Sequence, residues 1–136
     1  MTQTPPSERT LLIDGARIEG IADFYAEINR VFMAQEDWEL GASLDALDDM
    51  LYGGYGAAKG NAPVRLRWLN AERSRARLGI GATRAHYLDK LARPDTFNHQ
   101  HWLGALHALE AGHGPTYFEQ ICRVMASHPR FTLELA

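Results

Sequence analysis

Apolar residues recur along this chain with two different periods, and the periods predict short strands separated by helices. Residues 10–13 form a brief apolar run that ends at the turn signal Asp14-Gly15, as a buried strand does. Residues 64–68 and 131–135 alternate strictly between apolar and polar positions, which is typical of strands with one buried face. We therefore expect a strand at each of these places.

Between the expected strands, apolar residues recur at helical spacing. Phe24, Ile28, Val31 and Phe32 predict an amphipathic helix over residues 21–32. Asn70 is expected to cap a helix over residues 71–78. The same spacing predicts three further helices, at residues 83–91, 99–109 and 116–127. Glycine and proline separate them, at Gly79-Ile80-Gly81, Arg93-Pro94-Asp95 and Gly112-His113-Gly114-Pro115.

One short helix is predicted in more detail, over residues 44–51. Ser43 is a good N-cap, and Gly53-Gly54 ends the helix. Leu44, Leu47 and Leu51 recur at i, i+3 and i+7, so we expect them to be buried. A second face carries Asp45, Asp48, Asp49 and Tyr52. We expect Asp45 and Asp49 to be exposed on one side.

The order of these elements predicts an α/β fold, because parallel strands need crossovers long enough to hold a helix. We expect a small three-stranded parallel sheet flanked by helices. Residues 1–9 read as a disordered polar lead, and residues 10–136 as a single domain. With 136 residues, 46% of them hydrophobic, the chain is long enough for one real core.

Composition narrows the location and the chemistry. No apolar run approaches the roughly 20 residues that a bilayer span needs, and the first residues lack a signal-peptide pattern, so we expect a cytoplasmic protein without a membrane partner. The single cysteine, Cys122, has core spacing with Phe118 and Met125 and is interpreted as a buried small hydrophobe. No phosphate-binding glycine loop or nucleophile motif is present, which argues against an enzyme.

The net charge of −3 hides an uneven distribution of charge. Residues 31–58 contain no lysine or arginine and carry the acids Glu36, Asp37, Glu39, Asp45, Asp48 and Asp49. Residues 59–93 carry lysines and arginines against only Glu72 and Asp89. Such asymmetry indicates either a charged partner or ion pairs formed across the fold.

Several local strings resemble the barstar family of ribonuclease inhibitors. They are Ile13-Asp14-Gly15 with Ile18 and Ile21-Ala22-Asp23-Phe24, then Gly41 to Leu51 with Gly53, then Leu66-Arg67-Trp68 with Glu72, Ser74 and Leu78. The Leu-Asp-Ala-Leu string at residues 44–47, with an acid beyond it, is the most specific part. Residues 117–135 are similar in type and spacing, and the resemblance leaves about residues 80–114 as a helical insertion.

The resemblance implies a non-enzymatic inhibitor without a cofactor, whose acidic helix and adjoining loop block a basic ribonuclease or a related toxin nuclease. Asp45 and Asp49 match the family's acidic contacts, Asp49 at the most deeply inserted position. The chain departs from the family at Glu39, Asp48, Gly54 and Arg123, which replace a tyrosine, two tryptophans and an acid. The expected partner-binding residues are Trp38, Glu39, Asp45, Asp48, Asp49, Tyr52 and Tyr55.

The sequence also contains candidates for a metal site and for an RNA-binding surface. His99 and His101 would need a strand to point together, whereas a helix is expected there, so we predict no metal site. The arginine-rich stretch 65–84 is a candidate for RNA binding, with Trp68 as a stacking surface, but we expect Trp68 in the core. A structural or assembly protein on the same fold, and a homo-oligomer, stay open as alternatives.

Overall fold

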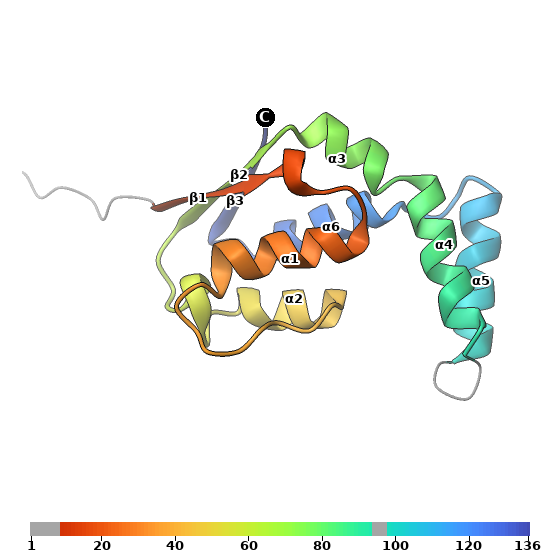
Figure 1. Ribbon diagram of the computed structural model, residues 1–136, viewed down its shortest axis with the longest axis horizontal. Helices are drawn as coiled ribbons and strands as arrows, with labels where there is room; N and C mark the ends of the chain where they lie inside the picture. The colour runs from red at the N-terminus through yellow and green to blue at the C-terminus, as the bar shows by residue number, and fades with distance from the viewer. Residues whose placement is uncertain (1–8, 94–97) are drawn as a thin grey trace, which may run out of the picture.

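The computed structural model of the chain describes residues 9–93 and 98–136. Its centre is a sheet of three parallel strands, β1 (Arg9–Asp14), β2 (Val64–Leu69) and β3 (Phe131–Leu135), in the order β1-β2-β3 (Figure 1). The α/β fold is thereby confirmed. Arg9 pairs with Val64 in the sheet, so it belongs to β1 and its assignment to a polar lead was wrong; residues 1–8 lie outside the described residues.

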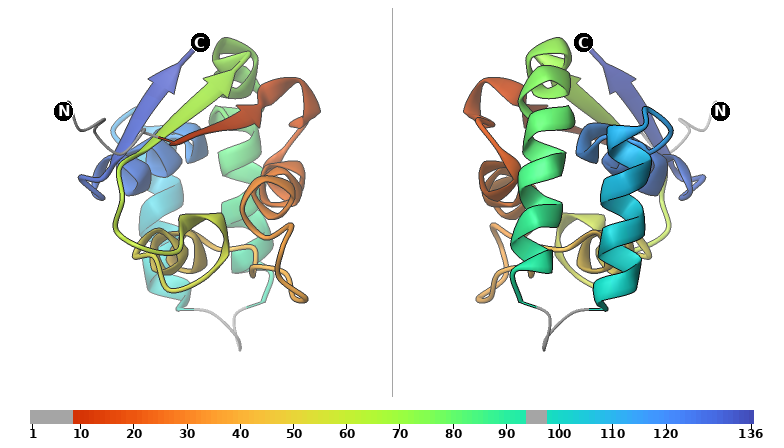
Figure 2. Two further views of the ribbon diagram at one scale, coloured as in Figure 1. Left: turned by 90° about the vertical axis from the view of Figure 1, so that its left-hand side faces the viewer. Right: turned by 90° about the vertical axis from the view of Figure 1, so that its right-hand side faces the viewer.

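The two faces of the sheet differ in what covers them. Helices α1 (Ile21–Phe32) and α6 (Tyr117–Ala126) lie on the face to which Val64, Leu66 and Trp68 point (Figure 2). The other face carries Arg65 and Arg67, which pair with Glu134 of β3 at 2.9 and 3.4 Å. The strict alternation along β2 therefore reflects one buried and one exposed face.

Trp68 lies at the centre of the core, as expected, with no exposed surface. Its ring stacks on Phe24 at 5.7 Å between centroids and meets the edge of Phe118 at 5.1 Å. Its indole N–H donates to the hydroxyl of Ser74 at 2.9 Å, which satisfies the one polar atom of the ring. Trp68 is therefore not available as a stacking surface for RNA.

Helix α2 (Leu44–Leu51) has the predicted bounds, and Ser43 caps it by accepting the Ala46 N–H at 3.0 Å. Leu47 and Leu51 are buried as predicted. Leu44 is only half-buried, whereas Met50, which was not predicted to be buried, has no exposed surface.

Helix α3 (Ala71–Arg77) follows β2 directly. Asn70 precedes it in the left-handed region at φ 55°, and its side chain makes no capping bond, so the predicted cap is wrong. The turn is also tight on the opposite side, where the short 3-10 helix Gly15–Arg17 begins. A Cβ at Gly15 would lie 2.5 Å from the Leu69 carbonyl oxygen, so this contact requires glycine.

Helices α4 (Ile80–Leu91) and α5 (His99–Glu110) form a hairpin beside the sheet domain, where the insertion was predicted (Figures 1 and 2). α4 begins at Ile80 rather than at Thr83, because Gly79 already serves as its N-cap. The predicted break at Arg93-Pro94-Asp95 lies partly outside the described residues. No helix in residues 9–93 or 98–136 has the length and apolar character needed to cross a membrane.

Candidate functional site

The exposed side of α2 presents two carboxylates one helical turn apart. Asp45 and Asp49 are both exposed, while Leu47, Met50 and Leu51 hold the opposite side in the core. Asp45 lies in the first turn, where the positive end of the helix dipole offsets part of the repulsion between the two acids. The core therefore fixes the direction in which both carboxylates point.

Asp49 is held in place by an aromatic neighbour. The hydroxyl of Tyr55 donates to Oδ2 of Asp49 at 3.1 Å. Partial burial, together with this bond and the charge of Asp49, raises the pKa of Tyr55, so the phenol remains a donor. The ring of Trp38 lies 4.8 Å from that of Tyr55 and is 44% exposed. Trp38, Tyr55 and Asp49 thus form one continuous patch.

The loop between α1 and α2 carries Trp38. Hydrogen bonds anchor it to α1 and to the segment that follows α2. The side chain of Asn29 accepts the Leu40 N–H at 2.7 Å and donates to the Tyr25 carbonyl at 3.0 Å. The carboxylate of Glu36 accepts the Gly56 N–H at 3.1 Å. The bonds to the Leu40 and Gly56 N–H groups satisfy backbone donors outside regular secondary structure, so the loop has a defined path.

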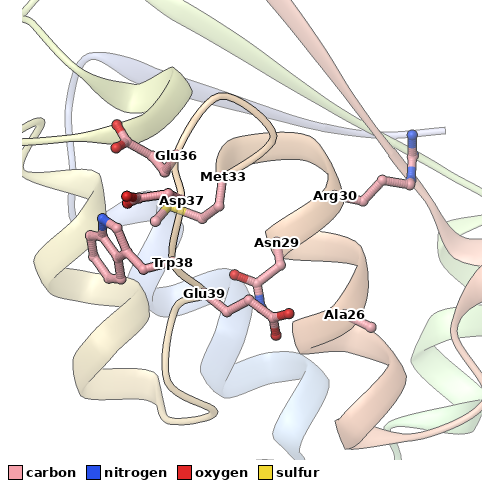
Figure 3. Close-up of a pocket in the computed structure, with 8 residues that line it drawn as sticks. All are labelled: Ala26, Asn29, Arg30, Met33, Glu36, Asp37, Trp38 and Glu39. Atoms are coloured by element: carbon pink, nitrogen blue, oxygen red, sulfur yellow. The ribbon is translucent and has the colours of Figure 1, made fainter.

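A cavity of about 540 Å³ opens between this loop and α1. Figure 3 shows Glu36, Asp37 and Trp38 on the loop side, Asn29 and Arg30 on α1, and Glu39 near the side chain of Asn29. Arg30 already binds Glu27 through two hydrogen bonds of 2.7 and 2.5 Å. The cavity is therefore acidic in character.

The segment after α2 is closed by backbone contacts. Gly53 adopts φ 99°, and its carbonyl accepts the Gly60 N–H at 2.9 Å. A Cβ at Gly53 would lie 2.4 Å from the Gly60 carbonyl oxygen, so a larger residue would displace the segment that carries Tyr55. Arg130 reinforces the closure by donating to the Ala58 and Ala62 carbonyls.

Asp48 points away from Asp45 and Asp49. Its Oδ1 lies 2.7 Å from Nε2 of His128, a buried histidine just beyond α6. The ring of Tyr52, which is 75% exposed, meets the edge of His128 at 4.7 Å. Asp48 and Tyr52 therefore form a second group on α2, beside the one that contains Asp49.

A comparison with models of protein families shows the family to which this chain belongs. Residues 8–102 match the model of the family described as Barstar (barnase inhibitor). The chain belongs to the barstar family. A comparison of the sequence with curated proteins found no match. The matched segment contains α1, α2, the anchored loop and β2, and it ends inside α5. The assignment of residues 80–114 as an insertion within the family fold stays a prediction.

The structure places the predicted partner-binding residues of this barstar-family chain on α2 and its adjoining loops, in separate groups. Trp38, Tyr55 and Asp49 touch one another, whereas Asp48 and Tyr52 gather at His128. Glu39 lines the acidic cavity. Asp45 instead lines a second cleft, which it shares with Arg123 of α6.

Sequence reasoning missed the residues that support this surface, namely Asn29, Glu36 and His128. Asn29 gives a weak signal, because asparagine inside an amphipathic helix is a poor helix former and suggests a side chain with another task. His128 gives none, because its partner Asp48 is 80 positions away in the sequence.

The arginine-rich stretch does not form one basic surface. Arg73 and Arg77 of α3 both pair with Glu19, and Arg84 of α4 binds Glu110 at 2.6 Å. Arg75 lies over the ring of Phe118, at 4.8 Å from its centroid. The arginines of this stretch are thus used largely in ion pairs with acids outside residues 31–58.

A metal centre finds no support in the described part of the chain. Residues 9–93 and 98–136 contain no group of three or more histidine, cysteine or acidic side chains placed to hold an ion. His99 and His101 lie in the first turn of α5. Side chains two positions apart on a helix point in different directions. Cys122 is half-buried, and burial raises the pKa of its thiol, which disfavours a nucleophilic thiolate.

Proposed function

We propose that this protein binds and blocks a basic ribonuclease, or a related toxin nuclease, through α2 and the loops beside it. Family membership supports an inhibitor rather than a catalyst. The observation that carries the proposal is the exposure of Asp45 and Asp49 on a helix whose other side is fully buried. Arg65 and Arg67, the cations that could have neutralised Asp49 internally, pair with Glu134 instead.

The chemistry of the expected target fits such a surface. An enzyme that cleaves RNA lines its cleft with cationic side chains to hold phosphates, and carboxylates can occupy the same positions. The bond from Tyr55 holds Asp49 in one orientation before any partner arrives. Less side-chain freedom is then lost on association, which favours affinity.

The aromatic residues of the surface would supply its apolar anchors. Trp38 and Tyr52 are among the large hydrophobic side chains that remain exposed, at 44% and 75%. Tryptophan and tyrosine are the residue types that most often dominate binding energy at protein interfaces. The proposed binding residues are Trp38, Glu39, Asp45, Asp48, Asp49, Tyr52 and Tyr55. Action in the cytoplasm without a cofactor stays a prediction.

The test is inhibition of RNA cleavage by barnase and by small basic nucleases encoded beside the gene of this protein. Asp49→Ala and the isosteric Asp49→Asn should each weaken binding by about 2 to 5 kcal/mol, mostly through faster dissociation, because a desolvated cation in the nuclease loses its partner. Folding should survive, since the substitution also removes a repulsive neighbour of Asp45.

Glu72→Ala is the matched control, because the Glu72 side chain is 84% exposed and lies on α3, away from α2. It should leave the dissociation rate unchanged and alter only the association rate slightly. Wild-type protein that inhibits none of these nucleases, or equal losses in the Asp49 and Glu72 variants, would contradict the proposal.

A further inference from the structure

A second cleft, of about 720 Å³, lies at the first turn of α2. Figure 1 shows that the first turn of α2 is directed toward the α4–α5 hairpin, and the cleft occupies the space that these elements enclose with α6. Its walls include Asp45, Tyr87, Lys90, Trp102, Tyr117 and Arg123. The volume is within the usual range of pockets for small ligands, about 300 to 1,000 Å³.

Aromatic rings in fixed positions line this cleft. The hydroxyl of Tyr87 accepts the amide N–H of Gln120 at 2.9 Å, and that of Tyr117 lies 2.5 Å from the hydroxyl of Tyr25. Both rings are almost fully buried. Trp102, half-buried on α5, lies 5.7 Å from Tyr87. Trp102 is therefore the ring with surface left for a ligand, and Tyr87 and Tyr117 form the buried base of the cleft.

The charge of the cleft is mainly positive. Lys90 places its ammonium 5.8 Å from the centre of the Trp102 ring, and the exposed Arg123 reaches the cleft from α6. Among the described residues, Asp45 is the one acid on the walls. Burial lowers the pKa of His86, and the charge of the nearby Lys90 lowers it further. His86 contacts the rings of Trp102 and Tyr117 as a neutral group.

Each class of ligand can be compared with these walls. A cation would be repelled by Lys90 and Arg123, and an uncharged apolar molecule would bring no anionic group to either cation. A planar ring that carries an anionic group suits the rings and the two cations together. The carboxylate of Asp45 can in addition accept N–H groups from the edge of such a ring.

We propose that this cleft binds a nucleoside monophosphate, either free or as the phosphorylated end of an RNA strand. The base stacks on Trp102, the phosphate binds Lys90 and Arg123, and Asp45 accepts hydrogen bonds from the base. This site shares Asp45 with the proposed nuclease-binding surface, but its ring and its two cations come from α4, α5 and α6. The proposal therefore stands whether or not the protein inhibits a nuclease.

Isothermal titration calorimetry of the full chain with guanosine monophosphate, adenosine monophosphate and inorganic phosphate tests the proposal. At least one nucleotide should bind about tenfold more tightly than phosphate, because stacking adds to the charge interaction. A 5′-phosphorylated RNA trinucleotide that binds more tightly than the mononucleotide identifies RNA ends as the ligand, and equal or weaker binding identifies free nucleotides. No nucleotide binding, or phosphate binding as tightly as the nucleotides, would overturn the proposal.

Two variants locate the ligand. Trp102→Leu keeps an apolar side chain on α5 but lacks a ring, and it should bind the nucleotide about tenfold more weakly. Arg123→Gln removes an exposed cation and should weaken binding similarly while reducing its dependence on salt. Arg77→Gln is the control, since Arg77 lies on α3, pairs with Glu19 and does not line the cleft.

Thermal unfolding of each variant shows whether it remains folded. If Trp102→Leu does not fold, Arg123→Gln decides alone. Nucleotide affinity that stays at the wild-type value in Arg123→Gln, and in Trp102→Leu where it folds, would place the ligand elsewhere and refute the site.

Discussion

Helix α2 and the α4–α5 hairpin lie on either side of the second cleft, and they differ in how firmly the core holds them. α2 has 8 residues and buries Leu47, Met50 and Leu51. α4 and α5 have 12 residues each and bury only Thr83 and Tyr87 on one and Leu109 on the other. The polar side of α2 is therefore fixed by the main core, whereas the hairpin depends on a small number of contacts.

This difference separates two kinds of surface. The patch formed by Trp38, Tyr55 and Asp49 is built on the core and has one geometry, which suits a large rigid partner. The hairpin forms one wall of the cleft and is held mainly by α5 against α4, with a small contact to α6. Its wall can adjust to a small ligand with little effect on the sheet.

The largest expected effect comes from removing matched leucine side chains in the two regions. Leu47→Ala should lower the free energy of unfolding by about 2 to 5 kcal/mol, because Leu47 is fully buried in the core. Leu106→Ala on α5 should lower it by less than about 1.5 kcal/mol, because Leu106 is only half-buried. Urea unfolding of both variants measures the difference. Equal losses would show that the hairpin is part of the main core.

A smaller effect is expected where the hairpin joins α6. The hydroxyl of Thr83 donates to the Gly79 carbonyl and accepts the buried Tyr117 N–H, both at 2.7 Å. Thr83→Val keeps the shape but leaves that N–H without its acceptor, which should cost about 1 to 3 kcal/mol.

Hydrogen exchange at the Tyr117 amide, together with urea unfolding, measures this effect. The amide should exchange faster in Thr83→Val than in the wild type. Thr132→Val, on the exposed face of β3, is the control and should change stability by no more than about 0.5 kcal/mol. An unchanged exchange rate in Thr83→Val would mean that the two helices are joined by other contacts.

The smallest effect concerns pH and is confined to the hairpin. Burial lowers the pKa of His86 in the folded protein, and the charge of Lys90 adds to this while Asp89 opposes it. The unfolded chain then binds a proton more readily, so His86 stabilises the fold above its ordinary pKa of about 6.5 and this contribution is lost as the pH falls below it.

The free energy of unfolding of the wild type and of His86→Gln, compared between about pH 7.5 and about pH 5, isolates the contribution of His86. These pH values bracket a histidine pKa of about 6.5. The wild type should lose more stability than the variant as the pH falls. A wild type that loses less than the variant would mean that the folded protein favours the charged imidazole, and the sign of the effect would be reversed.

The sequence was sufficient wherever a local pattern decides local structure. α1, α2 and β3 have the predicted bounds, because periodic apolar residues and the Ser43 cap act within one or two turns. It was insufficient at Asn70, which adopts the left-handed region without a side-chain cap and lies where the chain passes close to Gly15. It also did not reveal that Met50 is buried while Leu44 is only half-buried.

For the candidate site, the sequence by itself determined which residues are acidic, that Asp45 and Asp49 share one side of a helix, and that the chain resembles the barstar family. Only the tertiary structure decided how those acids are used. Asp49 meets Tyr55, Asp48 meets His128 and Asp45 faces a cationic cleft. The His128 contact joins residues 80 positions apart, and the cleft joins α2 to α4, α5 and α6. A periodic pattern describes only residues a few positions apart in the chain. Contacts between distant residues are therefore fixed by packing and not by local pattern.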